Sequence, residues 1–354
     1  MTRVVVIGGG IAGASAAARL AQKADVTLLE AETQFGYHSS GRSAAMFEEN
    51  YGTDTTCTLN RASRPYHEAQ GVLSPRGLMI VTNAEDEEQF QRDLVTMRMN
   101  EVNVSAAFDR VPVLAPNVIR AAVHDDAHDI DTDRLLQGFL KEARRAGAVV
   151  KSSSRVTAIE RAACWQISDG QTEIEADILV NAAGAWADEV ASLAGVKKIG
   201  LQPNRRSMAR LPAPGDHDVR RWPMLFGPGE SWYAKPDGGS WLVSPAEEHP
   251  IKAMDAWPDD MVLAEGLHRY GAYVTEHVKR PIATWAGLRT FSPDRSLVIG
   301  ADPDMDDFFW CAGQGGYGIQ SSPAASQCLA DLVFGEAPVL TREVVDALSP
   351  ARFR

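Results

Sequence analysis

Two stretches of the chain share the glycine spacing of a dinucleotide-binding loop, G-x-G-x-x-G. The first places Gly8, Gly10 and Gly13 after a Val/Ile-rich run, and the second occupies residues 313–318. Glycine lets the backbone approach a pyrophosphate closely, and the helix that follows aims its positive N-terminus at the phosphates. The chemistry to expect is therefore binding of a nucleotide cofactor, at one site or at two.

The elements around the first loop complete a nucleotide-binding unit. Residues 3–8 predict a buried strand, residues 11–24 a helix of small residues, and residues 25–30, "DVTLLE", a second strand that ends in Glu30. A carboxylate at this place suits a ribose 2′-hydroxyl and repels a 2′-phosphate, which favours FAD or NAD over NADP. After the second loop comes one helix, and Glu336 falls in a predicted turn. We therefore predict one dinucleotide, bound at the first loop.

Composition excludes several classes of protein. The 354 residues are 45% hydrophobic and 23% charged, which predicts a globular chain of two domains. No apolar run reaches the roughly 18–20 residues of a membrane span, and a net charge of -12 argues against nucleic acid as a partner. The four cysteines form no C-x-x-C pair, so we expect reduced packing residues, no metal site and a cytoplasmic location.

Further strand–helix patterns lie in the middle and at the end of the chain. A helix should begin at Asp131 or Thr132 and end at Gly147. The intervening segments alternate in polarity, with a hairpin signal at Asp237-Gly238. We predict an α/β fold with a discontinuous nucleotide-binding domain (residues 1–75, 128–197 and 286–354) and an inserted domain (residues 76–127 and 198–285).

Six motifs extend the interpretation. They are "EAETQFGYHSSGRSAAMFEENYG", "DIDTDRLLQGFL", "LVNAAGAWADEVA", "LQPNRRSM", "TWAGLRTFSPD" and "AGQGGYGIQ". Together, and in this order, they resemble the D-amino-acid-oxidase-like (DAO) FAD-dependent oxidoreductases, and within that superfamily most of all the FAD-dependent D-arginine dehydrogenases. The resemblance covers essentially the whole chain. It implies a Rossmann-type FAD-binding domain (GR2/DAO-like) with an inserted, mainly antiparallel α+β substrate domain.

The resemblance also implies one FAD held by both glycine loops, the second at the flavin ring. Some relatives attach the flavin to a cysteine just after "AGLR", but "TFSPD" has none here, so we expect non-covalent FAD. The implied cofactor-binding residues are Gly8, Gly10, Ile11, Ala12, Gly13, Glu30, Ala31, Ser40, Gly41, Arg42, Ser43, Ala44, Ala45, Val156, Ala183, Gly184, Trp186, Gly287, Gly315, Gly316, Tyr317, Gly318, Ile319 and Gln320.

A substrate pocket is implied beside the flavin. Arg206 and Arg289 match carboxylate-binding arginines, although Arg205 is an adjacent competitor for the first role. Two forked guanidiniums can hold an α-carboxylate bidentately. The other residues implied at the reacting end are Tyr51, Tyr233, Gly316 and Gln320.

The chain departs from the D-arginine dehydrogenases at two pocket positions. Leu78 stands where they have a glutamate for the substrate guanidinium, and Met46 replaces a histidine. A leucine cannot pair with a cation, and a stranded charge would cost several kcal/mol. Glu48 and Glu49 could supply a substitute anion, but we expect them to be solvated. The preferred substrate is therefore a neutral or apolar D-amino acid.

The predicted reaction is oxidative deamination. Hydride transfer from Cα to the flavin gives an imino acid, which hydrolyses to a 2-oxo acid and ammonia, and O₂ or a quinone reoxidises the cofactor. An assisting base, if any, is Tyr51 or water. The alternatives are a glycine or secondary-amine oxidase and a 2-hydroxy-acid dehydrogenase on the same fold. A non-enzymatic flavin-binding module is disfavoured because both candidate arginines are present.

Overall fold

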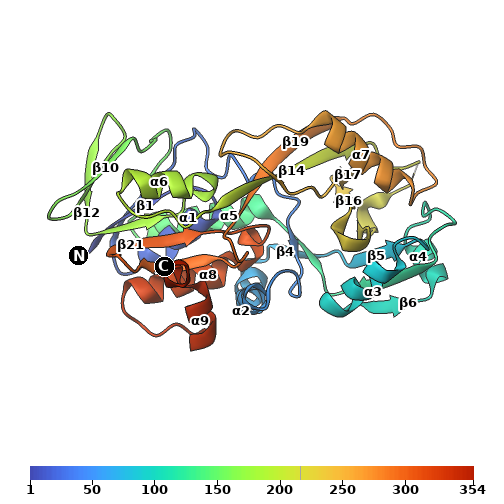
Figure 1. Cartoon of the computed structure of the whole chain (residues 1–354), viewed down its shortest axis with the longest axis horizontal. Helices are drawn as coiled ribbons and strands as arrows, with labels where there is room; N and C mark the ends of the chain where they lie inside the picture. Colours follow the sequence, from blue (N-terminus) through green and yellow to red (C-terminus); the bar gives the residue numbers. More distant parts are fainter. Residues whose placement is uncertain (216) are drawn as a thin grey trace.

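The computed structural model describes residues 1–215 and 217–354. Two large sheets lie toward opposite ends of the longest axis, one near the β1, β13 and β21 strands and the other near the β5, β16 and β17 strands (Figure 1). The long strands β14 and β19 run together between these ends (Figure 1). The site described below lies where segments of both sheets meet.

The first sheet, as far as the described residues show it, has six strands in the order β20-β21-β13-β1-β2-β9. All neighbours are parallel except β20 and β21. The strands are β1 (Arg3–Ile7), β2 (Asp25–Leu29), β9 (Val149–Lys151), β13 (Ile178–Asn181), β20 (Val298–Asp302) and β21 (Met305–Ala312). This is the parallel sheet predicted from the strand–helix patterns.

Both faces of this sheet are covered, which explains why β1 reads as an unbroken apolar run. Val4 and Val6 face a core made with helices α1, α5 and α8, whereas Val5 and Ile7 face a second core made with helix α6 and a three-stranded sheet. The elements are α1 (Ile11–Leu20), α5 (Thr132–Arg145), α6 (Ala187–Leu193), α8 (Gly318–Val333), β10 (Ala158–Arg161), β11 (Trp165–Ser168) and β12 (Glu173–Ala176).

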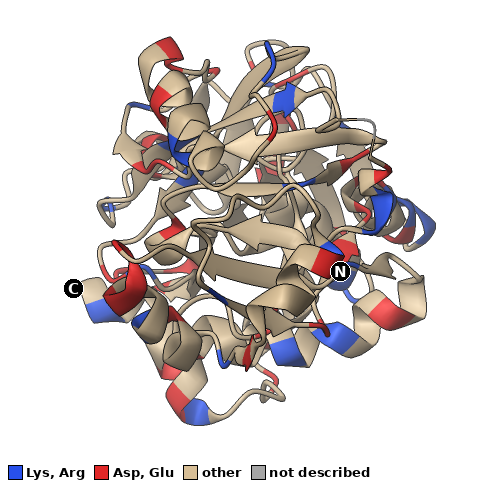
Figure 2. Ribbon diagram, turned by 90° about the vertical axis from the view of Figure 1, so that its right-hand side faces the viewer, with Lys and Arg blue, Asp and Glu red and all other residues tan. Residues whose placement is uncertain are grey.

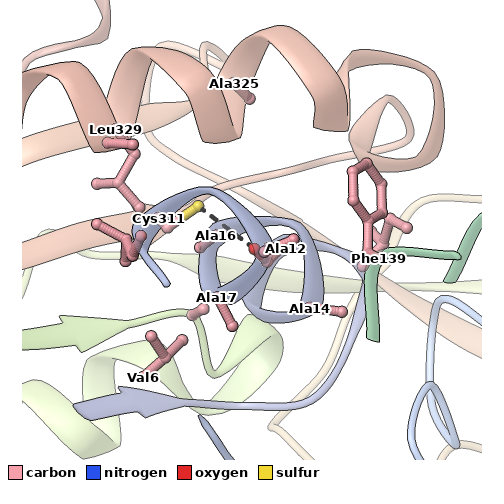
Figure 3. Packing of buried hydrophobic residues seen from close by; sticks show 14 of the residues in the cluster. Val6, Ala12, Ala14, Ala16, Ala17, Phe139, Cys311, Ala325 and Leu329 are labelled. Atoms are coloured by element: carbon pink, nitrogen blue, oxygen red, sulfur yellow. Dashed lines mark hydrogen bonds between the residues drawn. The ribbon is translucent and has the colours of Figure 1, made fainter. Parts of the chain in front are cut away.

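Helix α1 is buried on nearly every side, because its small residues let it lie between the sheet and helix α8 (Figure 3). A Cβ added to Gly13 would lie 1.8 Å from the carbonyl oxygen of Gly8, so only glycine permits this approach of helix and loop. Cys311 packs against Ala12 from the neighbouring strand. All four cysteines are free, and Cys57, Cys311 and Cys328 are buried.

The second sheet is mainly antiparallel, with eight strands in the order β18-β14-β17-β16-β15-β5-β7-β6 and β19 added beside β14 in the described chain. Its strands are β5 (Leu78–Thr82), β6 (Asn100–Val102), β7 (Arg120–His124), β14 (Gln202–Leu211), β15 (Met224–Phe226), β16 (Tyr233–Asp237), β17 (Ser240–Ser244), β18 (His249–Pro250) and β19 (Ala283–Phe291). The predicted hairpin is confirmed: β16 and β17 turn at Gly238 and Gly239, both with positive φ. Strand β19 crosses the predicted boundary at 285/286, and the division into domains stays a prediction.

The remaining elements connect the sheets or cover their edges. Helix α5 begins as predicted, because Asp131 Oδ1 accepts a hydrogen bond from the Arg134 N–H at 2.9 Å. It ends at Arg145, just before the predicted Gly147. The other elements are α2 (Asp54–Gln70), α3 (Glu87–Thr96), α4 (Val104–Arg110), α7 (Asp260–Gly271), α9 (Arg342–Leu348), β3 (Met46–Phe47), β4 (Leu73–Pro75), β8 (His128–Ile130) and the short 3₁₀ turns η1 (Gly184–Trp186), η2 (Val219–Arg221), η3 (Pro228–Glu230) and η4 (Pro350–Phe353).

Charged residues of both signs are interspersed around the outside of the ribbon, while the central strands carry few of them (Figure 2). In the part of the chain that the structure describes, no helix has both the length and the apolar character to cross a bilayer.

Candidate active site

One long cavity joins the first glycine loop to the second sheet. Most of the predicted site residues line it, so the structure brings together segments from the beginning, middle and end of the chain. They are Gly8, Gly10, Ile11, Ala12, Glu30, Ala31, Ser40, Arg42, Ser43, Ala44, Ala45, Tyr51, Val156, Ala183, Gly184, Trp186, Arg206, Tyr233, Gly287, Arg289, Gly315, Gly316, Gly318 and Ile319.

Four predicted residues lie behind the lining. Gly13 and Gly41 are packing glycines, since a Cβ would meet the backbone oxygens of Gly8 and Gly36 at 1.8 and 2.5 Å. Tyr317 packs its ring 5.2 Å from that of Tyr51. The fourth, Gln320, is buried and is described with the second loop below. Three of the four therefore shape the cavity without forming its surface.

The nucleotide end is organised by Glu30 at the end of β2. Its Oε2 accepts a hydrogen bond from the Gly9 N–H at 2.7 Å, and its Oε1 accepts one from the Glu32 N–H at 2.8 Å. These bonds fix the carboxylate at the rim of the loop, where it also lines the cavity. Gly10, Ile11 and Ala12 at the N-terminus of helix α1 line the cavity, and Ser40 Oγ accepts a hydrogen bond from the Ile11 N–H at 2.9 Å. A helix N-terminus in this place suits a pyrophosphate.

The second glycine loop contacts protein side chains instead. A Cβ added to Gly316 would lie 1.5 Å from Arg289 Nη2, so the guanidinium occupies the space that a side chain would fill. Helix α8 starts directly after this loop. In its first turn Gln320 accepts the Glu48 N–H with Oε1 at 3.0 Å, whereas its buried Nε2 has no partner among the described residues.

Arg206 and Arg289 lie on one face of the second sheet. Strands β14 and β19 pair so that Arg206 is opposite Gly287 and Arg289 is opposite Asn204. Residues opposite each other, and residues two apart on one strand, point to the same face. Arg205 therefore points to the other face, where its Nη2 lies 3.3 Å from Asp259. Both Arg206 and Arg289 line the cavity.

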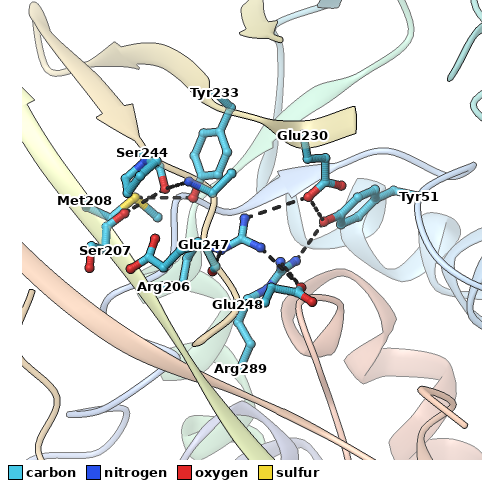
Figure 4. Close-up of polar contacts among 12 residues, drawn as sticks. Tyr51, Arg206, Ser207, Met208, Glu230, Tyr233, Ser244, Glu247, Glu248 and Arg289 are labelled. Carbon is cyan, nitrogen blue, oxygen red and sulfur yellow. Dashed lines mark hydrogen bonds and ion pairs between the residues drawn. The ribbon is translucent and has the colours of Figure 1, made fainter. Parts of the chain in front are cut away.

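Tyr51 connects Arg289 to an acid that the sequence did not single out, Glu230 (Figure 4). Arg289 Nη2 donates to the Tyr51 hydroxyl at 2.8 Å, and that hydroxyl donates to Glu230 Oε2 at 3.1 Å. Burial raises the pKa of Tyr51 above its ordinary value, so the side chain stays a phenol. Burial acts to lower the pKa of Arg289, but Tyr51 and Glu230 outweigh it and raise that pKa, so the guanidinium stays charged.

Behind the arginines, Glu248 holds both guanidiniums in place (Figure 4). Its Oε1 lies 3.2 Å from Arg206 Nη2 and 3.2 Å from Arg289 Nη1. Arg206 is also fixed by the carbonyl oxygen of Glu247, which accepts from its Nε at 2.9 Å. Glu248 does not line the cavity, so it positions the arginines from outside it.

The rest of the cavity beside the arginines is apolar. Tyr233 directs its hydroxyl to Met208 Sδ at 3.3 Å, and the surrounding side chains form one buried cluster. The residues that both belong to or pack on this cluster and line the cavity include Met46, Leu78, Met97, Met208, Met224 and Phe226. We call these six residues the apolar wall. The sequence singled out only Met46 and Leu78, and the short apolar run of residues 224–226 was the available signal for two more.

Glu48 corrects one prediction. We expected it to be solvated, but it is only 4% exposed and lines the cavity. Its Oε2 lies 2.5 Å from Nδ1 of His124, and that pair is what allows a carboxylate to be buried here. Glu49 is less buried and lies 3.8 Å from Arg61 and Arg64.

Comparison of the chain with known proteins identifies its family. The FAD dependent oxidoreductase family model (DAO) matches residues 3–332. Glycine oxidase of Pseudomonas putida is 25% identical over 369 residues, which is 96% of each chain. Dimethylglycine dehydrogenase of Rattus norvegicus is 25% identical over 375 residues, 94% of this chain but 43% of that protein. The chain thus spans less than half the length of some curated relatives that it matches.

Among solved structures, glycine oxidase from Geobacillus kaustophilus matches with a TM-score of 0.83 at 22% identity, over 99% of each chain. This likeness concerns the fold. The closer resemblance to the D-arginine dehydrogenases stays a prediction. The family match spans nearly the whole chain, and the glycine loop after β1, the N-terminus of helix α1 at the cavity and Glu30 at the end of β2 agree with it. The chain belongs to the DAO family of FAD-dependent oxidoreductases, and its cofactor is FAD.

Proposed function

We propose that this protein oxidises the Cα–N bond of an amino acid, and that its preferred substrate is a D-amino acid with a neutral or apolar side chain. The observation that carries the proposal is the pair of arginines on one face of the second sheet, next to the apolar wall and in one cavity with the nucleotide loop. An α-carboxylate would bind the guanidiniums, and the side chain would lie against the wall.

The residues present fit FAD at both ends of the cavity. Glu30 would accept hydrogen bonds from the ribose, the N-terminus of α1 would hold the pyrophosphate, and Gly315, Gly316 and Ile319 line the end of the cavity where the flavin would lie. When bound, FAD supplies the acceptor for two electrons and the Cα hydrogen. No cysteine lines the described part of the cavity, which supports non-covalent binding.

The chain's own residues bind and orient the substrate. Arg206 and Arg289 each offer a fork of N–H donors, and an arginine lost from such a buried pair costs about 2–5 kcal/mol of binding. Tyr51 stays protonated, so it is not a general base. It accepts one N–H of Arg289 and Glu248 accepts another, which leaves the remaining donors of the arginine for substrate. The amine is neutral when the Cα–H bond breaks, and its proton leaves to water. The Cα–N single bond becomes the C=N bond of an imine. Hydrolysis of the imine by water then gives a 2-oxo acid and ammonia.

Glycine or a secondary amine is the second candidate, since two relatives bear the names glycine oxidase and dimethylglycine dehydrogenase. The apolar wall favours the first candidate. Glycine has no side chain to cover Leu78, Met208 or Phe226, whereas a leucine or methionine side chain would bury apolar area worth about 1.5–3 kcal/mol. A 2-hydroxy acid would bind the same arginines, so it belongs in the test.

The test is anaerobic bleaching of the flavin absorbance by a matched panel. D-leucine and D-methionine are run beside their L-enantiomers, glycine, sarcosine and D-2-hydroxyisocaproate. We expect the two D-amino acids to bleach the flavin fastest. Bleaching by glycine or sarcosine alone would establish the second candidate, and bleaching by an L-enantiomer or the hydroxy acid alone would refute the D-amino-acid proposal. Repetition in air distinguishes an oxidase from a dehydrogenase.

A further inference from the structure

A buried acid–base pair lies beside the apolar wall and has no part in the proposed reaction. Glu48 Oε2 lies 2.5 Å from His124 Nδ1, and Glu48 Oε1 accepts a hydrogen bond from the Asn50 N–H at 3.0 Å. The carboxylate is 4% exposed and the imidazole side chain 17% exposed. Glu48 lines the cavity, whereas His124 lies behind it.

The register of the sheet places this pair at the wall. His124 is the last residue of β7 and is paired with Leu78, the first residue of β5. Directly opposed residues of antiparallel strands point to the same face. The imidazole therefore lies next to the Leu78 side chain, on the cavity face. An apolar wall thus carries one carboxylate, and that carboxylate is covered by a histidine.

We propose that Glu48 and His124 form a charge switch that selects the substrate side chain. With a charged imidazole the pair is neutral, and the cavity accepts an apolar side chain. With a neutral imidazole the carboxylate is uncompensated, and it binds the ammonium or guanidinium of a cationic D-amino acid. This inference rests on the proposed function. It assigns to Glu48 the cation-binding role that Leu78 cannot perform.

The titration of His124 sets the pH at which the switch operates. The hydrogen bond that the His124 imidazole donates to Glu48 raises the pKa of His124 above its ordinary value of about 6.5, and burial opposes the shift only in part. The imidazole therefore keeps its proton beyond the pH at which a free histidine loses it. Below the raised pKa of His124 the charge of Glu48 is compensated, and above it the carboxylate is free to bind a cation.

Other charges near the imidazole are themselves paired. Asp126 and Glu49 act on His124 through space and favour its charged form. Asp126 is bound by Arg64 at 2.5 Å, and Arg64 also lies 3.8 Å from Glu49. Asp125 is bound by Arg110 at 2.5 Å. Of these acids only Glu48 lines the cavity. Glu230 lines it as well, but its Oε2 accepts from the Tyr51 hydroxyl and lies 3.8 Å from Arg206 Nη1, so its charge is already paired.

The primary experiment measures, on the holoenzyme, kcat/KM for D-lysine divided by kcat/KM for D-leucine between about pH 6 and 9. The two substrates share the α-amine and α-carboxylate, so their ratio removes the ionisation of those groups. We expect the ratio to rise at least about tenfold with pH in the wild type, the factor that corresponds to about 1.4 kcal/mol of charge pairing. A ratio that is flat with pH would overturn the proposal.

Two variants separate the charge from the packing. His124→Asn keeps a donor near Nδ1 without a charge, so the ratio should be high at every pH. Glu48→Gln keeps the volume of the side chain and removes the anion, so the ratio should be low at every pH. An unchanged pH profile in either variant would overturn the switch.

A direct readout is the titration of the His124 imidazole by NMR of histidine-labelled holoenzyme. The resonance is assigned by its absence in His124→Asn, and its pKa should fall in Glu48→Gln. D-Leucine turnover with an unmoved ratio and an unmoved pKa would refute this inference alone. No bleaching by D-leucine or D-lysine would refute the proposed function, and the switch with it.

Discussion

Arg289 packs so closely on the second glycine loop that one methyl group should displace it. In Gly316→Ala the new Cβ would lie 1.5 Å from Nη2, 2.2 Å from Cζ and 2.4 Å from Nε of Arg289. Real Cβ atoms essentially never lie within 3.0 Å of another heavy atom, so Nη2 must move away from its 1.5 Å position by at least a further 1.5 Å. The 2.8 Å bond from Nη2 to the Tyr51 hydroxyl cannot survive that movement.

The expected cost follows from the size of the displacement. A substrate group misplaced by about 1 Å loses on the order of a hundredfold in rate. We expect Gly316→Ala to lower kcat/KM for D-leucine by about that factor or more. The control is Gly138→Ala in helix α5, where a Cβ meets nothing within 4 Å, so activity should be retained. Steady-state kinetics and the FAD content of each purified variant are the measurements.

A double variant tests whether the loss passes through Arg289. If the methyl acts by moving this guanidinium, Gly316→Ala combined with Arg289→Ala should be no worse than Arg289→Ala alone, because coupled sites are non-additive. Additive losses would refute the reasoning. So would full activity of Gly316→Ala, or a loss of activity that matches a loss of bound FAD.

Three further outcomes are expected. Arg206→Ala should lower kcat/KM by a factor equivalent to about 2–5 kcal/mol. Arg205→Ala should leave kcat/KM near the wild-type value, because the Arg205 side chain pairs with Asp259 on the opposite face of the sheet. Equal losses in the two variants would show that the carboxylate site has been assigned to the wrong arginine. Acid denaturation should release all FAD into the supernatant, and flavin retained on the protein would show a covalent bond. Because the pKa of His124 is raised on folding, its stabilisation is full below about pH 6.5 and is lost as pH rises through the folded pKa. The wild-type Tm should therefore fall over that range relative to Glu48→Gln, and parallel Tm profiles would contradict this.

Local patterns account for the parts of the fold that could be predicted from sequence. The Val/Ile run, the glycine spacing and Glu30 all lie within one strand–helix–strand unit, so near neighbours decide their structure. The Asp131 cap and the Gly238-Gly239 turn are local in the same sense. Arg206 and Arg289 were found through a family resemblance. Their common face became visible only in the register of β14 and β19.

The apolar wall and the Glu48 pair could not be predicted because long-range pairing creates them. Strand β15 lies parallel to β5, which joins Met224 to Leu78 across the sheet, and no short pattern encodes that neighbour. Glu48 and His124 are 76 residues apart in the chain. A glutamate in "MFEENYG" with no known partner is expected to be exposed to solvent. The prediction for Glu48 was wrong because its contact with His124 is not visible in the sequence.

The two glycine loops have the same spacing for different physical reasons. At the first loop, Cβ atoms added to Gly8 and Gly13 would strike backbone, at 2.4 Å from the Ala182 oxygen and 1.8 Å from the Gly8 oxygen. At the second loop, Cβ atoms added to Gly315 and Gly316 would strike side chains of β19, the Phe291 ring at 2.6 Å and the Arg289 guanidinium. The space that a second nucleotide would need is therefore filled by the protein's own arginine. Spacing alone predicts a close approach, and the acid at the end of β2 decides that the approaching group at the first loop is a nucleotide. At the second loop the same close approach brings Arg289 against Gly316, just before helix α8, which agrees with our proposal that one cofactor and one amino acid, rather than two nucleotides, occupy the cavity.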